Sequence, residues 1–171
     1  MRLRRVGGFT LIELLVTLGV LAVLLVAAAP AMTDMILNNR MSGFSNDLMA
    51  DLAMARSEAL KRSQRVVICK NAGTDSTCGT GAWETGWLLY LDADSDTVLD
   101  TGETILRVRQ ALPGGYTINS AGIADTLVVR PVGLATPTGT FRICDQRAGN
   151  FGRLITISAA GRASVAPATC P

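Results

Sequence analysis

The sequence predicts an α+β fold in which one long N-terminal helix packs on an antiparallel β-sheet. Three observations lead to this prediction: an apolar run near the N-terminus, a helical repeat of apolar residues behind it, and short strand-like segments over the rest of the chain. With 171 residues, the chain is long enough for one modest domain plus an extension.

The first element is an apolar run from Phe9 to Ala29, which Pro30 follows directly. At about 1.5 Å of rise per residue, a helix of this length matches the roughly 30 Å hydrocarbon core of a bilayer. Three basic residues, Arg2, Arg4 and Arg5, precede the run. We therefore expect residues 9–29 to span the inner membrane once, with the leader in the cytoplasm and the C-terminal domain in the periplasm.

Glu13 is an acidic residue inside this apolar run. A charged side chain at the centre of a bilayer costs roughly 2.5–3.5 kcal/mol on insertion scales, and such residues normally have a partner. No Lys or Arg occurs between Phe9 and Pro30. Cleavage between Gly8 and Phe9 would create a cationic amine close to Glu13, either in the same chain or in a neighbour. A cut at this point would therefore supply the partner that Glu13 lacks within the apolar run.

Two simpler interpretations of the N-terminus are an ordinary secretory signal peptide and a plain single-span anchor. Signal peptides have an apolar core of about 7–15 residues followed by a small-residue cleavage site, which the alanines at 27–29 could imitate. The run at 9–29 is longer than that, and an acidic residue near its start is foreign to such peptides. A plain anchor leaves Glu13 without a role.

The second element is an amphipathic helix over residues 30–64, expected to end between Arg62 and Gln64. Apolar residues recur there at steps of three and four and form one stripe, which should pack on a sheet. The stripe comprises Met41, Phe44, Leu48, Leu52, Ala55 and Ala59.

The third element is a β domain over residues 65–171, where short apolar segments are separated by Gly, Pro, Asn and Asp. The expected strands are Val66–Lys70, Trp87–Leu91, Ile105–Leu112, Tyr116–Asn119, Thr126–Val129, Phe141–Cys144, Leu154–Ser158 and Arg162–Val165.

The chain has no histidine and four cysteines, Cys69, Cys78, Cys144 and Cys170. Without histidine it lacks the commonest general base and metal ligand. An even number of cysteines behind a membrane segment indicates an oxidising compartment and two disulfides, although buried free thiols are the alternative. The sequence leaves three connectivities open. The short spacing between Cys69 and Cys78 suits a local link, and Cys144 would then pair with Cys170.

The segment from Gly8 to Leu14, Gly-Phe-Thr-Leu-Ile-Glu-Leu, resembles the class III signal of type IV prepilins and type II secretion pseudopilins. This resemblance implies that residues 1–8 are a leader, that a prepilin peptidase cuts after Gly8, and that the new amine of Phe9 is methylated. It also implies that Glu13 helps the subunit to dock with a neighbour's N-terminus. The expected fold is therefore type IV pilin-like, with a transmembrane half and an amphipathic half in its helix.

Later motifs resemble the GspH/FimT family. They are Arg-Ser-Glu-Ala at 56–59 ahead of Val-Val-Ile-Cys at 66–69, Trp83 with Gly-Trp at 86–87, the acidic hairpin after it, and Gly-Arg at 161–162. The resemblance implies a minor pilin or pseudopilin and not an enzyme. Its partners would be the prepilin peptidase, the major subunit and other minor subunits at the tip of a filament. The residues do not decide between a type IV pilus and a type II secretion pseudopilus.

An acidic segment after Trp87 matches the spacing of a calcium loop. Asp92, Asp94, Asp96, Asp100 and Glu103 stand at positions 1, 3, 5, 9 and 12 of that template, and Val98 would supply its carbonyl at position 7. Thr97 departs from the template, which has Gly at position 6, and strands rather than helices are expected on both sides. A solvated acidic turn is the simpler interpretation, and no other cofactor is expected.

Two further groups of residues could bind ligands. Some relatives bind DNA through a Gly-Arg-x-Arg tail, but here Gly161-Arg162 is followed by Ala163-Ser164, so the second Arg is missing. A net charge of +2 also predicts weak attraction to nucleic acid. Trp83, Trp87 and Tyr90 could form a sugar-binding platform, although a place in the core is the favoured interpretation.

Overall fold

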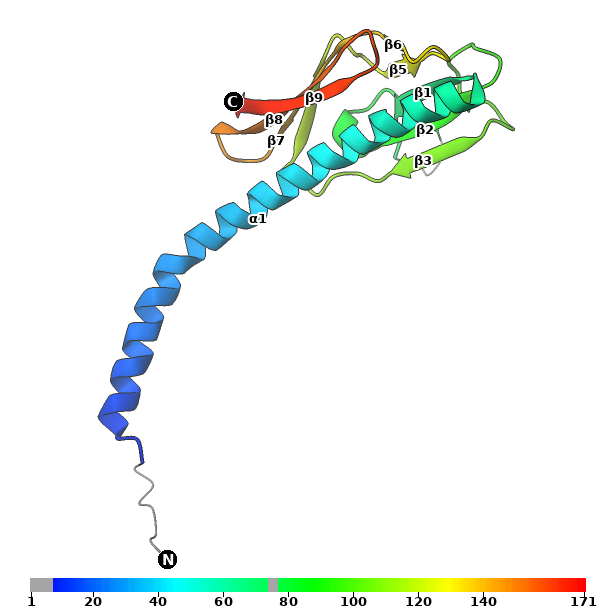
Figure 1. Ribbon diagram of the computed structural model, residues 1–171. Helices are drawn as coiled ribbons and strands as arrows, with labels where there is room; N and C mark the ends of the chain where they lie inside the picture. Colours follow the sequence, from blue (N-terminus) through cyan, green and yellow to red (C-terminus); the bar gives the residue numbers. More distant parts are fainter. Residues whose placement is uncertain (1–7, 74–76) are drawn as a thin grey trace, which may run out of the picture. The chain divides into compact units, whose positions relative to one another are not determined.

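The computed structural model describes residues 8–73 and 77–171 (Figure 1). Helix α1 comprises Leu11–Arg62 and passes through Pro30 without interruption. The chain forms two compact units, the first ending at Asn39 and the second comprising Arg40–Pro171. The described part of the first unit is helical from Leu11 onward, and the second contains the rest of α1 and all the strands.

The second unit contains a five-stranded antiparallel sheet. Its spatial order is β3 (Ile105–Arg109), β2 (Trp87–Asp92), β1 (Arg65–Lys70), β5 (Thr126–Val129) and β6 (Ala135–Thr136). A short 3-10 helix, η1 (Trp83–Thr85), precedes β2. The register pairs Val67 with Tyr90 across β1 and β2, and Trp87 with Arg109 across β2 and β3.

A four-stranded antiparallel sheet completes the second unit. Its order is β4 (Thr117–Ala121), β7 (Gly139–Cys144), β8 (Gly149–Ile157) and β9 (Ala163–Cys170). β9 is an edge strand and contains Pro167. An edge tolerates proline because one side of the strand needs no hydrogen-bond donor.

The C-terminal half of α1 lies along the five-stranded sheet (Figure 1). Five residues of the predicted apolar stripe are buried: Met41, Leu48, Leu52, Ala55 and Ala59. The sixth, Phe44, is half-buried and meets Tyr116 edge to face, with the ring centroids 4.8 Å apart. The stripe is therefore a core-packing face, as its spacing predicts.

The five-stranded sheet is also buried on part of a second face. Val67, Cys69, Leu88 and Tyr90 form one buried cluster there, and Leu99, Ile105 and Val108 cover it in part. Because both faces of β2 are covered, all six of its residues are buried. The acidic segment between β2 and β3 begins at the end of this doubly buried strand.

The structure confirms the α+β class, the antiparallel strands and the end of the helix at Arg62. It differs from the sequence prediction in having two sheets, in the short strand β6, and in the longer strands β8 and β9. The compact C-terminal unit begins at Arg40, so it contains the C-terminal part of α1 as well as the strands. This is because the helical stripe supplies part of its core.

Two disulfides lie in the second unit. Cys69 at the end of β1 is joined to Cys78, and Cys144 at the end of β7 is joined to Cys170 at the end of β9. The second link encloses strand β8 between its two half-cystines. It fastens β9 to the rest of the sheet at the end of the strand farthest from the β8–β9 turn.

Candidate functional site

Gly8, Phe9 and Thr10 precede helix α1 and are all exposed. The backbone at the predicted cleavage point is therefore non-helical and open, as an extended protease substrate requires. The leader arginines, Arg2, Arg4 and Arg5, lie outside the described residues, so the rest of this prediction is not addressed by the structure.

Thr10 caps the N-terminus of α1. Its side-chain Oγ1 accepts a hydrogen bond from the backbone N–H of Glu13 at 3.3 Å. Thr-x-x-Glu at the start of a helix is a capping-box pattern, in which the Thr satisfies one of the free N–H groups of the first turn. The sequence could have shown this role for Thr10, because the spacing of the pair is its signature.

Glu13 is exposed in the first turn of α1. The positive end of the helix dipole favours an anionic side chain at this position. Among residues 8–73 and 77–171, no Lys or Arg forms an ion pair with Glu13. The carboxylate is therefore open to a partner from another chain.

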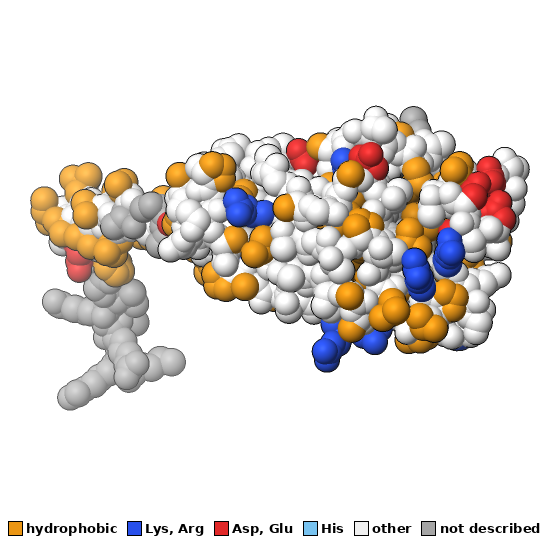
Figure 2. Space-filling model, turned by 90° about the horizontal axis from the view of Figure 1, so that it is seen from above, with side chains coloured by type: hydrophobic (Ala, Val, Ile, Leu, Met, Phe, Trp, Pro, Cys, Tyr) orange, Lys and Arg blue, Asp and Glu red, His pale blue; other side chains and the backbone are white. Residues whose placement is uncertain are grey.

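The large apolar side chains of the first unit are exposed. They comprise Phe9, Leu11, Ile12, Leu14, Leu15, Val16, Leu18, Val20, Leu21, Val23, Leu24, Leu25, Val26, Met32, Met35 and Ile36. Phe9 is 83% exposed and Leu18 is 53% exposed. Apolar surface of this extent marks an interaction surface, and hydrophobic atoms dominate this unit in Figure 2.

In the part of the chain that the structure describes, no helix is both long enough and apolar enough to cross a membrane.

The acidic segment forms the loop between β2 and β3. One oxygen from each of Asp92, Asp94 and Asp96 lies within 4.8 Å of the other two. The backbone N–H of Asp96 donates to Asp92 Oδ1 at 3.1 Å and to Asp94 Oδ1 at 3.3 Å. The loop therefore brings the first three predicted ligands together, and hydrogen bonds from its backbone to the carboxylates of Asp92 and Asp94 hold its conformation.

Glu103 closes the same loop. Its Oε1 accepts a hydrogen bond from the backbone N–H of Ala93 at 2.8 Å, and its Oε2 accepts one from Asp100 at 3.2 Å. The carboxylate at the end of the segment is thus held against the start of the segment. Asp100 and Val98 are exposed within it.

A buried charged cluster joins α1 to β2 and β3. Asp51 is fully buried and accepts hydrogen bonds from Trp87 Nε1 at 2.9 Å, Arg109 Nε at 2.7 Å and Arg107 Nη1 at 3.1 Å. The hydrogen bonds that Arg109 donates to Asp51 raise the pKa of its guanidinium, and they outweigh burial, which lowers this pKa. The sequence analysis missed this cluster, although Asp51 stands three residues after Leu48 and one before Leu52 on the apolar stripe.

The C-terminal arginines do not form one basic patch. Arg142 is exposed on β7, whereas Arg147 pairs with Asp145 at 2.7 Å and lies over the ring of Phe151. Arg153 donates to the carbonyl of Gly152 at 3.1 Å. Arg162 is exposed in the β8–β9 turn.

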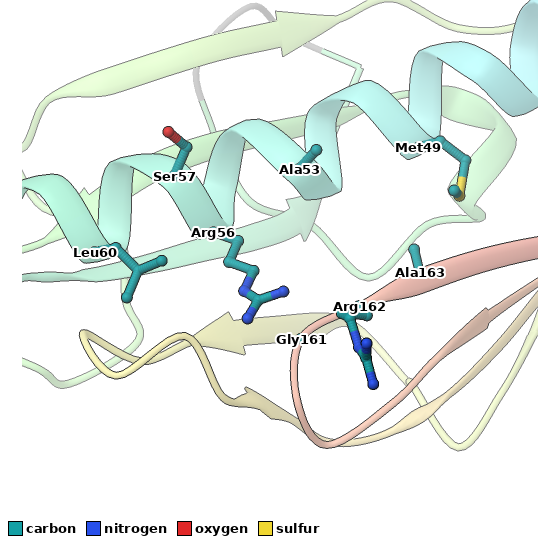
Figure 3. A pocket seen from close by; sticks show the side chains of 8 residues that line it. All are labelled: Met49, Ala53, Arg56, Ser57, Leu60, Gly161, Arg162 and Ala163. Atoms are coloured by element: carbon teal, nitrogen blue, oxygen red, sulfur yellow. The ribbon is translucent and has the colours of Figure 1, made fainter.

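A groove of about 460 Å³ lies between α1 and the β8–β9 turn. Its lining comprises Met49, Ala53, Arg56, Ser57 and Leu60 from the helix, and Gly161, Arg162 and Ala163 from the turn. Figure 3 shows Arg56 extending from α1 toward the turn. Gly161 has a φ of +64°, and a Cβ there would collide with the carbonyl oxygen of Gly133. The groove thus brings two guanidinium groups to one surface.

The three aromatic residues considered for sugar binding belong to the core. Trp83, Trp87 and Tyr90 are 2%, 2% and 0% exposed. The Trp83 ring meets Phe141 edge to face at 4.8 Å. The core interpretation is therefore confirmed.

Comparison with protein families gives two matches. The sequence profile described as Type II transport protein GspH matches residues 45–161. The profile described as Prokaryotic N-terminal methylation motif matches residues 3–29, which include Gly8, Phe9 and Glu13. A comparison with curated protein sequences finds no match.

Comparison with solved structures finds crystal structures of the type IV minor pilin FimU from Pseudomonas aeruginosa, in two crystal forms. The first is 23% identical, has a TM-score of 0.56, and covers 75% of this chain and 90% of that one. The second is 23% identical, has a TM-score of 0.54, and covers 74% and 92%. At this identity the similarity concerns the fold, which is a long N-terminal helix with antiparallel sheets.

Proposed function

This chain belongs to the GspH family of type II transport proteins, and from that premise we propose that it is a structural subunit of a filament tip. The filament is a type IV pilus or a type II secretion pseudopilus. The family and fold are those of minor pilins and pseudopilins rather than of enzymes. The N-terminal methylation motif at residues 3–29 supports the same class.

The observation that carries the proposal is the exposed apolar surface of the first unit, with the acidic Glu13 near its start. Burial of apolar surface contributes about 25 cal/mol of favourable free energy for each Å² that is removed from water. Hydrocarbon of the inner membrane would cover this surface before assembly, and neighbouring helices would cover it afterwards. We infer that residues 9–29 serve as the single-pass anchor first and as the filament core later.

Processing by a prepilin peptidase makes the switch between these two states possible. Cleavage after Gly8 removes the basic leader and leaves the methylated amine of Phe9 as a cation. Both residues are exposed and lie outside the helix, so the peptidase meets an accessible backbone. The cation of one subunit would then pair with Glu13 of its neighbour, which neutralises a carboxylate in an apolar environment.

The test combines mass spectrometry with a filament incorporation assay in the cells that produce the protein. We expect a mature chain that starts at methylated Phe9. In the Glu13→Ala variant, we expect the leader to be removed but incorporation into the filament to fall at least about tenfold, because the neighbour's cation loses its partner.

The control is Thr17→Val, one turn beyond Glu13 on α1. Thr17 Oγ1 donates to the backbone carbonyl of Leu14 at 2.9 Å, so its hydroxyl is satisfied within the helix. This variant should be incorporated normally. An uncleaved wild-type chain, or normal incorporation of Glu13→Ala, would contradict the proposal.

DNA binding is a second candidate function, favoured by the two arginines, Arg56 and Arg162, that line the groove beside α1. Two phosphate contacts would give weak, salt-sensitive binding, with a slope of about −0.9 per contact in the logarithm of salt concentration. A gel-shift assay should then show retardation that Arg162→Ala weakens and Arg142→Ala, outside the groove, does not. Absence of retardation at low salt would reject this candidate.

A further inference from the structure

The β2–β3 loop combines a ligand pattern with an unsatisfied buried carboxylate. Asp92 is 1% exposed, and its Oδ2 has no hydrogen-bond partner in the structure. Its Oδ1 already accepts from the backbone N–H of Asp96. A buried carboxylate oxygen without a partner is costly, because it has lost its water and gained nothing in exchange. This oxygen therefore needs a donor or a cation.

A second unsatisfied polar atom lies on the same strand. The hydroxyl of Tyr90 is buried and has no hydrogen-bond partner either. Tyr90 and Asp92 are two residues apart on β2, so their side chains leave the same face of the sheet. Burial, together with the charges of Asp92, Glu103, Asp96 and Asp100, raises the pKa of Tyr90. The base of the loop is thus a desolvated region of concentrated negative charge.

In the described part of the chain, protein cations do not neutralise this charge. Among the described residues, no Lys or Arg forms an ion pair with Asp92, Asp94, Asp96, Asp100 or Glu103. Arg65 reaches the loop, but its Nη1 donates to the backbone carbonyl of Ser95 at 2.9 Å and not to a carboxylate. Burial is the main cause that raises the pKa of Asp92, and it outweighs the backbone hydrogen bonds of the loop, which lower this pKa; the charge of Glu103 also raises it.

The backbone at Thr97 has the conformation that the calcium-loop template requires at this position, although the template has Gly there. The calcium-loop template has Gly at position 6 because the chain turns sharply there. Thr97 occupies that position with a φ of +69°, the left-handed conformation that glycine adopts most readily. The loop therefore makes the required turn without the glycine, and the remaining ligand positions keep their order.

We propose that the β2–β3 hairpin binds one calcium ion through the carboxylates of Asp92, Asp94, Asp96, Asp100 and Glu103, with the Val98 carbonyl as a further ligand. All the donors are oxygen atoms, which is the chemistry that hard cations prefer. Calcium accepts six to eight such ligands in flexible geometry, whereas magnesium demands a stricter octahedron and retains water. This inference does not depend on the role of the chain in a filament.

The experiment is a calorimetric titration of the full chain, in non-ionic detergent, with calcium chloride. We expect a Kd of about 10⁻⁴–10⁻³ M, the range of extracellular calcium modules. A ligand that binds only the folded state also stabilises it. At about ten times the Kd, calcium should therefore raise the melting temperature by about 4 °C.

The test variant is the double substitution Asp94→Ala and Asp96→Ala, and the matched control is Asp125→Ala. Both aspartates of the test variant are exposed, so the fold should survive their loss, which circular dichroism in chelator would check. Asp125 pairs with Lys70 outside the loop. The double variant should bind at least about tenfold more weakly, whereas the control should keep the wild-type affinity.

Three results would overturn the proposal. The first is a wild-type chain that releases no binding heat and melts at the same temperature in calcium and in chelator. The second is a double variant that responds to calcium as the wild type does. The third is an equal shift with magnesium at the same concentration, since general charge screening would then explain the effect.

Discussion

In the first unit, the large apolar side chains from Phe9 to Val26 are exposed, whereas in the second unit the apolar stripe of the same helix is buried. Leu18 is 53% exposed and Leu48 is 1% exposed, although both are leucines on α1. The two leucines differ in exposure because the second unit contains strands that cover its part of the helix, whereas the described part of the first unit contains none. An apolar face on a helix predicts that this face is buried, but it does not show whether the same chain or another molecule buries it.

Two acidic residues of α1, Asp51 and Glu13, show the same contrast. Asp51 in the second unit is satisfied by Trp87, Arg107 and Arg109 of its own chain. Glu13 in the first unit forms no ion pair with a described Lys or Arg. An acidic residue among apolar neighbours needs a cation in either case. We infer that the second unit contains its own, and that the first unit requires one from a neighbour.

The largest expected effect comes from breaking the internal cluster. Asp51→Ala should lower the free energy of unfolding by about 3–5 kcal/mol, because it removes the acceptor of three hydrogen bonds, two of them from arginines and one from the buried indole of Trp87. Urea unfolding of the full chain, followed by the fluorescence of Trp83 and Trp87, measures this loss. Asp47→Ala is the control, since Asp47 also contacts Arg109 but its side chain is 50% exposed. If Asp47→Ala lowered the free energy of unfolding by more than about 1 kcal/mol, the stabilisation could not be assigned to Asp51 alone.

The disulfides give the next largest effect. Their half-cystines are 26 and 9 residues apart in sequence. By loop-closure entropy, loss of Cys144–Cys170 should destabilise the chain by about 3.5 kcal/mol and loss of Cys69–Cys78 by about 2.6 kcal/mol. Paired Cys→Ser variants compared by urea unfolding test the order. A larger loss from the shorter loop would show that packing rather than chain entropy dominates.

A leucine pair tests the comparison of the two units directly. Leu48→Ala should lower the free energy of unfolding of the second unit by about 3 kcal/mol through a buried cavity. Leu18→Ala should leave that free energy unchanged and weaken filament incorporation instead. The same tryptophan signals report both variants, because both tryptophans lie in the second unit. Equal destabilisation by the two substitutions would remove the distinction drawn between the units.

The smallest effect concerns a local ion pair. Burial raises the pKa of Asp145, but the hydrogen bonds and charge of Arg147 outweigh it and hold this pKa below its usual range. The pair therefore stabilises the fold above pH 4 or so, near the unfolded pKa of about 3.9, and this contribution is lost as pH falls through the folded pKa. The Asp145 side chain is only 2% exposed, so Asp145→Asn should cost about 1–2 kcal/mol at pH 7 through its lost charge-assisted hydrogen bonds. Urea unfolding should show that the difference in free energy of unfolding between wild type and Asp145→Asn vanishes in acid. A difference that grows in acid would contradict the lowered pKa of Asp145.

Local patterns predicted the elements well, because each depends on residues close in sequence. The spacing from Met41 to Ala59 and the continuous apolar run Val66–Cys69 are examples. The pairing of Asp51 with residues 56 and 58 positions later has no local signal. Strand β9 was predicted to end at Val165, but it continues through Pro167 to Cys170, and only the sheet order shows that this strand is an edge.

For the candidate sites, the sequence predicted more at the N-terminus than in the loop. The leader motif is contiguous, so Gly8, Phe9 and Glu13 could be identified directly. The acidic spacing at 92–103 was visible as well, but the unsatisfied Asp92 oxygen depends on how β2 is buried. Thr97 argued against the template in the sequence, since residue type alone does not reveal a positive φ.

Pro167 in edge strand β9 of the four-stranded sheet affects whether strands of another chain can pair with that edge. A free strand border invites further strands, and chains crowded together can join there without limit. Pro167 lacks an N–H group, and β6 on the other sheet has two residues. At these two edges, both features discourage lateral growth by backbone pairing.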